Sequence, residues 1–409
     1  MARILYITYD GLTDPLGQSQ IIPYLQGLAK LGDQITILST EKKERYRRKH
    51  KIINSILAEA QIQWEHIFYH KKPPVISTLL DVRKLSNKAS VLSRKNHYDI
   101  VHCRSYLSSL IGLRLKRKIG IKFIFDMRGF WADERVDGKL WNLKNPIFRS
   151  IYNYFKRKEK AFLFESDAII SLTEAGKTEI ERWQDSDRYK NKINVIPCCV
   201  DTVFFDPGSI NDSTQKEKWT QLELRGNEFI LTYLGSIGTW YMLDEMLEFF
   251  ISLKKVRKNA KMLFITPETD HERIFTGTNQ HNLSKGDIRI IEADRKDVPV
   301  YLSISDFSIF FIKPSYSKIS SSPTKQGEIM ALGIPVICNE GVGDTSEIIT
   351  RYKSGISIKE LDTYHFSKAI KQMGSTSFDK KALRKGAIDY YSLDKGVAEY
   401  YQIYQTLTS

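Results

Sequence analysis

One stretch of the sequence, residues 321–337, combines side chains suited to binding phosphate with one suited to binding sugar hydroxyls. Ser322 can cap a helix, and Pro323 suits its first turn. The unpaired N–H groups at a helix N-terminus favour phosphate. Lys325 adds a full charge in the same turn, and Glu328 follows one turn later on roughly the same face. The pattern indicates a site for a diphosphate attached to a sugar, with an ordinary capped helix on a sheet as the alternative.

The elements that would position this stretch are strands and helices in alternation. Gly333 fits the end of the helix, and the apolar residues 335–338 fit a buried strand. Further upstream, an apolar strand over 229–234 runs into a loop that contains Gly235, Ser236, Gly238 and Thr239. Glycines let the backbone approach a phosphate closely. The loop is a second phosphate-site candidate, and a plain strand-to-helix turn is its alternative.

The first half of the chain begins with a βαβ pattern. A strand over 2–10 leads into a turn-rich loop over 11–20, an amphipathic helix and a strand over 34–39. Ligands in such sheets lie beyond the carboxyl ends of the strands. Gly17 and Gln18 of the loop are therefore site candidates. The segment is not a dinucleotide fingerprint, because the spaced glycines and the acidic residue after the second strand are missing.

A second loop in the first half gathers charged and aromatic side chains at the end of a strand over 121–126. Asp126 could steady a cationic sugar ring or orient a hydroxyl, and a structural role in the following turn is equally compatible with the sequence. Arg104 and Arg128 could meet a phosphate or form ordinary salt bridges. Trp131 could stack on a sugar or lipid or simply be packed. His102, at the end of a strand, fits a core residue better than a base.

Charge divides the chain into two unlike halves. The net charge of the 409 residues is +14. Residues 1–200 hold 36 Lys and Arg against 21 Asp and Glu, whereas 201–409 hold 26 against 27. Such asymmetry indicates that the first half meets something anionic: a membrane face, a phosphorylated lipid or nucleic acid. Solvated helix faces are the alternative for any single basic cluster.

Other sequence features indicate a two-domain protein of the cytoplasm. The four cysteines show neither metal-ligand spacing nor a disulfide framework. No run approaches the ~20 apolar residues of a membrane span. A polar segment over 206–214 is the expected linker between a domain over 1–206 and a domain over 215–390. Apolar residues at helical spacing predict a last helix within about 391–409: Val397, Tyr400, Tyr401 and Tyr404.

Several segments together resemble family 4 glycosyltransferases along nearly the whole chain. The stretch 321–337 resembles the donor-binding segment of that family in its variant Ser-Pro-Thr-Lys-x-x-Glu-x-Met-Ala-x-Gly-x-Pro-Val. The other matching segments, in order, are 14–20, 125–131, 195–201 and 233–238. The resemblance implies an α/β fold of the GT-B type, in which two Rossmann-like βα domains face a central cleft. The N-terminal domain would bind the acceptor, the C-terminal domain would bind the nucleotide-sugar, and the last helix would cross back to the N-terminal domain.

The family resemblance also implies roles for individual residues. Glu328 would bind the donor ribose, and Lys325 would bind the diphosphate. The donor site would comprise Gly235, Ser236, Gly238, Thr239, Ser322, Thr324, Lys325 and Glu328. The acceptor site would comprise Gly17, Gln18, Arg104, Arg128 and Trp131. The catalytic candidates are Asp126, Lys325 and Glu328.

The sequence departs from the family pattern at four positions. Many members have an Arg where this chain has Ser236 and a Lys where it has Tyr241. Lys325 must then carry more of the phosphate charge, with Arg295 as a further candidate. Ser320 replaces a second Glu, and Asp126 occupies the position of a catalytic-site His. Neither a metal nor a cofactor is expected, because the one Asp-x-Asp motif, residues 185–187, lies in the wrong domain.

The resulting hypothesis is a retaining transfer of a sugar from a nucleotide-diphosphate sugar to a hydroxyl of a lipid-linked or surface-polysaccharide acceptor. The basic first half adds an expected contact with an anionic membrane, so that the enzyme would sit on the inner face of the membrane. One alternative is a nucleotide-sugar epimerase or hydrolase on the same fold. The other, a basic nucleic-acid-binding protein, lacks a recognisable binding module, so nucleic acid is not an expected partner.

Overall fold

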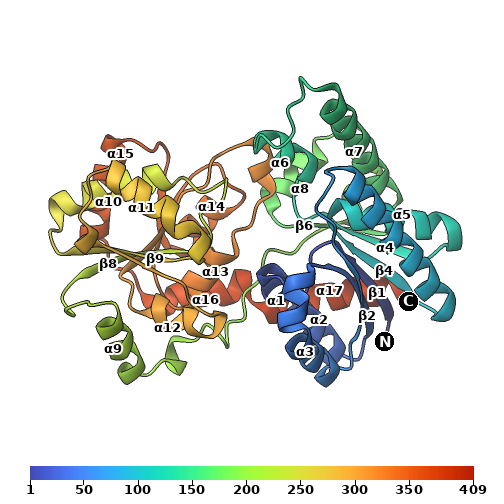
Figure 1. Ribbon diagram of the computed structural model, residues 1–409, viewed down its shortest axis with the longest axis horizontal. Helices are drawn as coiled ribbons and strands as arrows, with labels where there is room; N and C mark the ends of the chain where they lie inside the picture. Colours follow the sequence, from blue (N-terminus) through green and yellow to red (C-terminus); the bar gives the residue numbers. More distant parts are fainter. The chain divides into compact units, whose positions relative to one another are not determined.

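The computed structural model describes all residues, 1–409, and divides them into two compact units. The first unit comprises Met1–Cys199 and Leu393–Ser409, and the second comprises Val200–Ser392. Each unit has its own parallel sheet with helices on both faces (Figure 1). The prediction of two Rossmann-like α/β domains is therefore confirmed. No helix combines the length and the apolar character needed to cross a bilayer.

The first unit is built on a seven-stranded sheet in the order β3-β2-β1-β4-β5-β6-β7. All its strand pairs are parallel. The near-continuous burial of β1 and β4 is typical of strands covered on both faces. The order reverses between β1 and β4, where ligands of such sheets usually bind. The strands are β1 (Arg3–Thr8), β2 (Gln34–Glu41), β3 (Gln63–Phe68), β4 (Ile100–Arg104), β5 (Lys122–Asp126), β6 (Ala168–Ser171) and β7 (Ile193–Val195).

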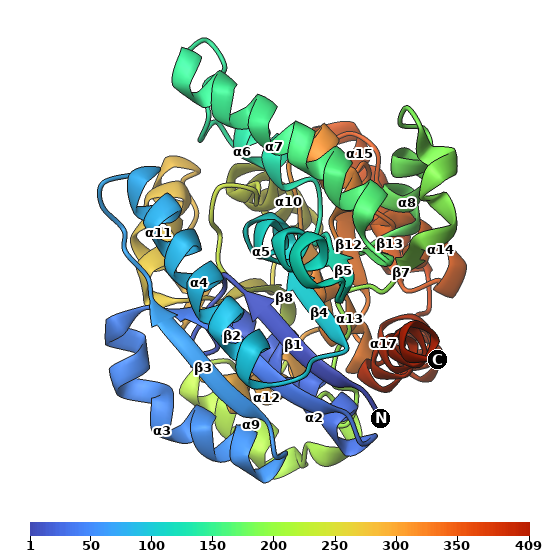
Figure 2. The same ribbon diagram turned by 90° about the vertical axis from the view of Figure 1, so that its right-hand side faces the viewer.

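Nine α-helices accompany this sheet, and Figure 2 shows α4 and α5 in front of it. The predicted loop over 11–20 is partly helical, because α1 begins directly at Pro15. The helices are α1 (Pro15–Gln20), α2 (Ile22–Lys30), α3 (Lys43–Glu59), α4 (Ile76–Lys95), α5 (Ser105–Ile119), α6 (Trp131–Asp137), α7 (Pro146–Glu165), α8 (Glu174–Glu181) and α17 (Leu393–Thr408).

The second unit has a six-stranded parallel sheet in the order β10-β9-β8-β11-β12-β13. Its strands are β8 (Phe229–Leu234), β9 (Ala260–Ile265), β10 (Ile288–Ile291), β11 (Phe307–Phe310), β12 (Val336–Asn339) and β13 (Gly355–Ile358). Its helices are α9 (Asp212–Gln221), α10 (Leu243–Val256), α11 (His271–Gln280), α12 (Val298–Ser303), α13 (Thr324–Ala331), α14 (Thr345–Tyr352), α15 (Thr363–Ser375) and α16 (Lys380–Tyr391).

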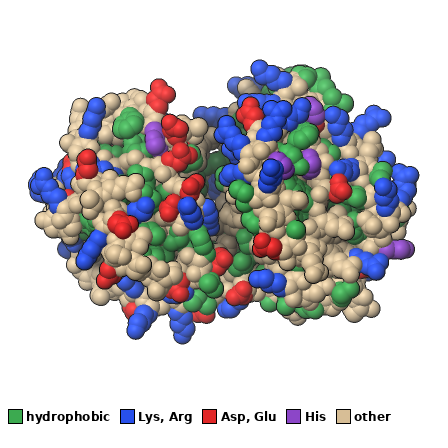
Figure 3. Space-filling model, turned by 60° about the horizontal axis from the view of Figure 1, so that its bottom comes forward, with side chains coloured by type: hydrophobic (Ala, Val, Ile, Leu, Met, Phe, Trp, Pro, Cys, Tyr) green, Lys and Arg blue, Asp and Glu red, His purple; other side chains and the backbone are tan.

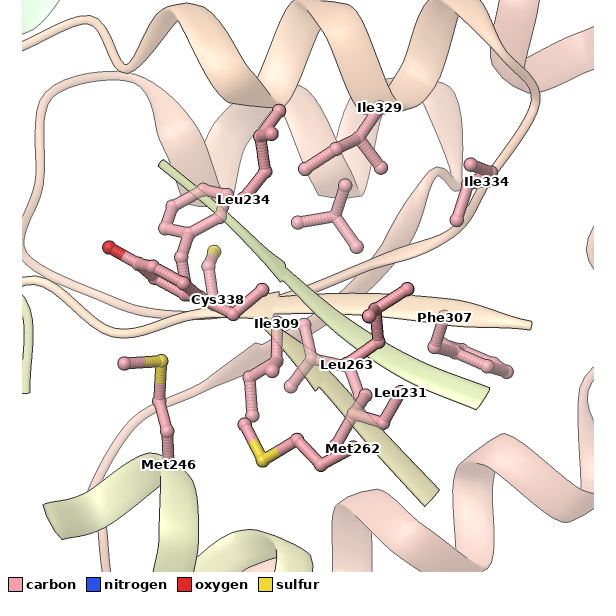
Figure 4. Packing of buried hydrophobic residues seen from close by; sticks show 14 of the residues in the cluster. Leu231, Leu234, Met246, Met262, Leu263, Phe307, Ile309, Ile329, Ile334 and Cys338 are labelled. Atoms are coloured by element: carbon pink, nitrogen blue, oxygen red, sulfur yellow. The ribbon is translucent and has the colours of Figure 1, made fainter. Parts of the chain in front are cut away.

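The core of the second unit fixes α13 against the sheet. Figure 4 shows Ile329 of α13 and the following Ile334 on one side of the strands, with Met246 of α10 on the other. All three side chains are buried. The left-handed backbone of Gly333 (φ +72°) ends the helix, as predicted, and turns the chain into β12. Apolar packing of α13 and the following residues against the sheet therefore fixes the position of the helix.

The chain passes from the first unit to the second at Cys199–Val200, before the expected linker over 206–214. Arg384 of α16 binds the first residue of that segment and two residues just before it. Its guanidinium donates to the carbonyl oxygens of Thr202 and Phe205 at 3.0 and 2.8 Å and lies 3.2 Å from a carboxylate oxygen of Asp206. Polar composition predicted a linker there, but these polar groups are bound to a helix that is remote in sequence.

The predicted last helix is α17, and its stripe of apolar residues packs within the first unit. Val397, Tyr400 and Tyr404 are buried, and Tyr401 is partly buried. A Cβ atom added to Gly27 of α2 would lie 2.6 and 2.9 Å from the two methyl carbons of Val397. The two helices therefore approach so closely that only glycine fits at this point.

We expect Gly27→Ala to destabilise the protein, because the stiff Val397 side chain cannot move aside without shifting a helix. Overpacking of this kind costs typically ~1–3 kcal/mol. Urea unfolding should show the lower stability. Gly374→Ala is the matched control, since a Cβ atom there meets nothing within 4 Å. Equal stability of the two variants would contradict the close helix contact.

Candidate functional site

The candidate donor site lies in the second unit, where the loop after β8 meets the first turn of α13. Gly235 and Gly238 both have left-handed backbones, with φ of +101° and +47°. A Cβ atom on Gly235 would lie 3.3 Å from Nζ of Lys325. The structure thus brings together the two phosphate-site candidates that are far apart in the sequence.

Lys325 lies against two tyrosine rings. Its Nζ donates a hydrogen bond to the hydroxyl of Tyr233 at 3.2 Å and lies 4.2 Å from the centre of that ring. The ring of Tyr241 is still closer, at 3.6 Å. Burial holds the pKa of Lys325 well below its usual value, and the attraction of Glu328 opposes this only in part. Tyr241, which replaces a family Lys, therefore supplies an aromatic face for Lys325 in place of a second cation.

Glu328 projects from the next turn of α13 and is almost completely buried. Its side chain is 6% exposed, and Oε1 lies 2.6 Å from Nη1 of Arg295. Arg295 begins the 3₁₀ turn η6 (Arg295–Asp297) and is 44% exposed. The sequence suggested Arg295 only as a helper for the diphosphate. Its contact with Glu328 was missed because no local pattern connects the two positions.

The other predicted donor residues surround this centre. Ser236 donates its hydroxyl hydrogen to Oδ2 of Asp270 at 2.7 Å, and the same oxygen accepts the N–H of Ile237 at 2.9 Å. Asp270 therefore fixes the glycine loop. Thr239 and Gly238 are exposed, whereas Ser322 and Thr324 are partly buried.

The start of α13 differs from the prediction in one detail. The helix begins at Thr324, its N-cap residue is Pro323, and no side chain caps it. The backbone of Pro323 is itself extended, with φ −71° and ψ 111°, so Pro323 is not yet part of the helix. Ser322 therefore lies one position outside the helix, and the prediction that it is the cap was wrong.

Asp126 occupies a different environment, at the carboxyl end of β5 in the first unit. Its carboxylate lies 3.5 Å from Nε2 of His102, 3.8 Å from Arg128 and 3.9 Å from Arg104, and it accepts a hydrogen bond from Tyr400 at 3.5 Å. Burial alone would raise the pKa of Asp126, but Arg128, His102 and Arg104 together hold it below its usual value. The carboxylate is 1% exposed, and its Oδ1 has no hydrogen-bonding partner within the protein.

The residues around Asp126 are equally enclosed. Burial lowers the pKa of His102, against the opposing effect of Asp126, and its Nδ1 lies 2.6 Å from the hydroxyl of Tyr404. Arg104 is 4% exposed and also pairs with Asp10 at 3.2 Å. His102 is thus a core residue, as the sequence indicated. The cluster connects α17 to the ends of β4 and β5.

The remaining predicted acceptor residues are mainly packed against the protein. Gly17 is buried in α1, and a Cβ atom there would lie 2.3 Å from the carbonyl oxygen of Gly11. Gln18 donates to the carbonyl oxygen of Thr13 at 3.0 Å. Trp131 begins α6 and contacts three aromatic rings with centroids 4.8–5.7 Å away. These contacts match the packing alternative for Trp131.

Glu41 is an organising residue that sequence reasoning missed. It ends β2 and is completely buried. Its carboxylate accepts the N–H groups of Leu12 and Thr13 at 2.7 and 3.2 Å and the hydroxyl of Ser39 at 2.6 Å. An acidic residue at the end of a predicted strand was the available signal. Glu41 shapes the loop that leads into α1.

Two family models match the chain one after the other. Residues 21–204 match the model of Glycosyltransferase Family 4, and residues 214–389 match that of Glycosyl transferases group 1. The chain therefore belongs to the family 4, group 1 glycosyltransferases and has the GT-B fold that its two sheets define. It is a retaining glycosyltransferase that uses a nucleotide sugar.

Solved structures agree with this fold. Sucrose-phosphate synthase from Thermosynechococcus elongatus superposes with a TM-score of 0.75 at 15% identity, over 100% of this chain and 99% of the other. The Anabaena protein HepE, in complex with UDP and glucose, gives 0.71 at 12% identity over 100% of both chains. WaaG, a glycosyltransferase involved in lipopolysaccharide biosynthesis, gives 0.66 at 12% identity, over 97% and 99%. No curated protein matches the chain significantly.

The buried charge cluster around Asp126 leads to a prediction about the stability of the protein. We expect Asp126→Asn to reduce the free energy of unfolding strongly, because Arg104 and Arg128 would keep their charges without the carboxylate. Removing one partner of a buried pair costs ~3–5 kcal/mol. Urea unfolding at neutral pH should show the loss, and Asp187→Asn, at an exposed pair with Lys190, should change little.

The same variant should reveal the pH dependence of the cluster. The folded pKa of Asp126 lies below its usual value, so the carboxylate adds stability above the unfolded pKa of about 3.9. That stability is lost as the pH falls through the folded pKa. The difference between the wild type and Asp126→Asn should therefore shrink in acid, and a constant difference would contradict the ionic cluster.

Proposed function

We propose that the second unit binds a uridine diphosphate sugar and that the enzyme transfers the sugar to a hydroxyl of a lipid-linked or surface-polysaccharide acceptor. The observation that carries the donor assignment is the position of Lys325 beneath the Gly235 loop, with Glu328 one turn away. HepE, which shares the fold, was crystallised with UDP-glucose. This relative makes UDP the first nucleotide to test.

The geometry suits the charge changes of the reaction. The bond between the anomeric carbon and the phosphate oxygen breaks, and a bond from that carbon to the acceptor oxygen forms. Negative charge grows on the departing diphosphate. The N–H groups of Gly235 and Ile237 donate within the protein, to the carbonyl oxygen of Ile265 and to Asp270. The remaining N–H groups of the loop and the ammonium of Lys325 would stabilise this charge as dipoles and a cation fixed before the reaction.

Glu328 is assigned to the donor ribose because a carboxylate is a strong acceptor for hydroxyl hydrogens. Its Oε2 has no hydrogen-bonding partner within the protein, whereas Oε1 is occupied by Arg295. One oxygen therefore remains for a ligand. Ser320 replaces the family's second Glu. Its hydroxyl donates a hydrogen bond to the carbonyl oxygen of Ser317 at 3.1 Å.

We expect Glu328→Ala to weaken UDP binding by about 1.5–3 kcal/mol, the usual contribution of a hydrogen bond to a charged group. Calorimetric titration with UDP measures this change, and thermal unfolding without ligand checks the fold. Glu347→Ala, at an exposed salt bridge of α14, is the control of equal charge change. Unchanged affinity in Glu328→Ala would remove the ribose assignment.

The transfer itself is tested by following the fate of the sugar. Incubation with radiolabelled UDP-sugars and a membrane extract should place the label on a lipid or polysaccharide. Release of free sugar or an epimer in the absence of any acceptor would instead favour the hydrolase or epimerase alternative. Failure of every nucleoside diphosphate to bind would contradict the donor assignment.

The membrane part of the proposal is based on the surface of the first unit. The structural relatives named above include a sucrose-phosphate synthase and a lipopolysaccharide enzyme, so the fold alone does not select a lipid acceptor. At the start of α4, Ile76, Leu79 and Leu80 are 56%, 65% and 53% exposed. Lys71 and Lys72, which residues 73–75 separate from Ile76, are also exposed. Apolar side chains close to lysines are typical of helices that bind at the interface of an anionic bilayer.

Basic side chains are also frequent elsewhere on the molecular surface, and Figure 3 shows many of them in blue. The start of α4 differs because three large apolar side chains accompany the charge. Burial of these three side chains adds an attraction that does not depend on salt. Binding through this surface should therefore persist in part when salt screens the lysines.

We expect the protein to sediment with vesicles of phosphatidylcholine and phosphatidylglycerol, and not with phosphatidylcholine alone. Leu79→Glu with Leu80→Glu should reduce this binding, because two charges would enter the apolar region of the bilayer. Val256→Glu, at a 71% exposed position of the second unit, is the control. Absence of the wild type from anionic vesicles at low salt would contradict the membrane assignment.

A further inference from the structure

The contact between Arg295 and Glu328 joins two elements of the second unit that are separate in the sequence. Arg295 lies in η6, just before α12, and Glu328 lies in α13. Nη1 of Arg295 is 2.6 Å from Oε1 of Glu328, with the carboxylate side almost fully buried and the guanidinium half exposed. The carboxylate of the pair is therefore shielded from solvent, whereas the guanidinium is partly in contact with it.

Two aromatic rings pack against the guanidinium of Arg295. The carbon at its centre lies 4.8 Å from the ring centre of Phe205 and 5.6 Å from that of Phe204. Phe205 is fully buried. The turn that carries both rings is fixed by Asp201, whose Oδ1 accepts the N–H groups of Val203 and Phe204 at 3.0 and 2.9 Å. Arg295 is therefore confined by stacking as well as by its ion pair.

The buried carboxylate needs Arg295 for its charge. A buried carboxylate is costly without a cation nearby. Lys325, one turn before Glu328, is a weaker partner in the free protein, because burial lowers the pKa of Lys325. Arg295 carries a permanent charge, so it is the group that neutralises Glu328.

We propose that Arg295 is a positioning residue for the donor nucleotide: by holding Oε1 of Glu328 it directs Oε2 toward the ribose and makes the site select ribose over 2′-deoxyribose. This inference rests on the proposed function, in which Glu328 binds the ribose. Without Arg295, the carboxylate is free to rotate or to turn toward Lys325. The ribose hydroxyl would then lose its oriented acceptor.

The selectivity follows from the cost of an unpaired acceptor. A site built to bond a hydroxyl rejects an analogue without it, because the buried acceptor is left without a partner. We expect the wild type to bind UDP about 10- to 100-fold more tightly than 2′-deoxy-UDP, as for one hydrogen bond to a charged group. The exposed half of the guanidinium leaves room for the nucleotide beside it.

The experiment is a comparison of dissociation constants for UDP and 2′-deoxy-UDP by calorimetric titration. The variants are Arg295→Ala, Arg295→Lys, Glu328→Gln and the double variant Arg295→Ala/Glu328→Gln. Lys296→Ala is the control, since it removes the same charge from the next residue of η6. Arg295→Ala should bring the ratio of the two constants close to one, and Arg295→Lys should restore part of it. The double variant should be no less selective than Glu328→Gln, because Arg295 acts through Glu328.

The outcomes separate the inference from the proposed function. If the wild type binds neither nucleotide, the proposed function fails. If the wild type and Glu328→Gln show the same ratio, the ribose assignment fails. A wild-type ratio retained in Arg295→Ala would overturn the role of Arg295 alone. Should Arg295→Ala fail to fold, as judged by thermal unfolding, the ratio in Arg295→Lys decides, and a ratio equal to that of the wild type overturns the inference.

Discussion

The structure depends on the pairing of charges that its parallel sheets bury. Parallel strands end along one edge of a sheet, and the polar residues that follow them are surrounded by helices. In the first unit this edge holds Asp126 with Arg104 and Arg128. In the second it holds Lys325 and Glu328. Since a buried charge is costly without partners, the remaining packing must bring the partners to these positions.

The two clusters meet this requirement with different partners. The carboxylate of Asp126 is enclosed by two arginines, His102 and Tyr400, so its interactions serve to tie α17 to the sheet. The carboxylate of Glu328 has a partner at one oxygen only. Oδ1 of Asp126 also lacks a hydrogen-bonding partner, so what distinguishes Glu328 is its position one turn from Lys325 and the glycine loop.

Much of the fold could be predicted from the sequence, because periodic apolar residues and glycine loops are local signals. The stripe of Val397, Tyr400 and Tyr404 predicted α17, and the motif around Lys325 located the donor-site candidates. The partners of these groups could not be predicted. Arg295 reaches Glu328 and Arg384 reaches the 202–206 segment only through tertiary packing. Trp131 was expected in a loop, but it begins α6 and packs against neighbouring aromatic rings, where it is partly buried. The predicted start of α13 was wrong by one residue, because Pro323 has an extended backbone and the helix begins only at Thr324.

The tyrosine pair around Lys325 has a consequence for proton balance. In the free protein, burial against Tyr233 and Tyr241 disfavours the charged ammonium. A diphosphate arriving at the Gly235 loop brings negative charge close to Nζ and so raises its proton affinity. Binding of the proposed donor would therefore favour the charged form of Lys325, so that Tyr241, in the place of a second fixed cation, would couple donor binding to the protonation of Lys325.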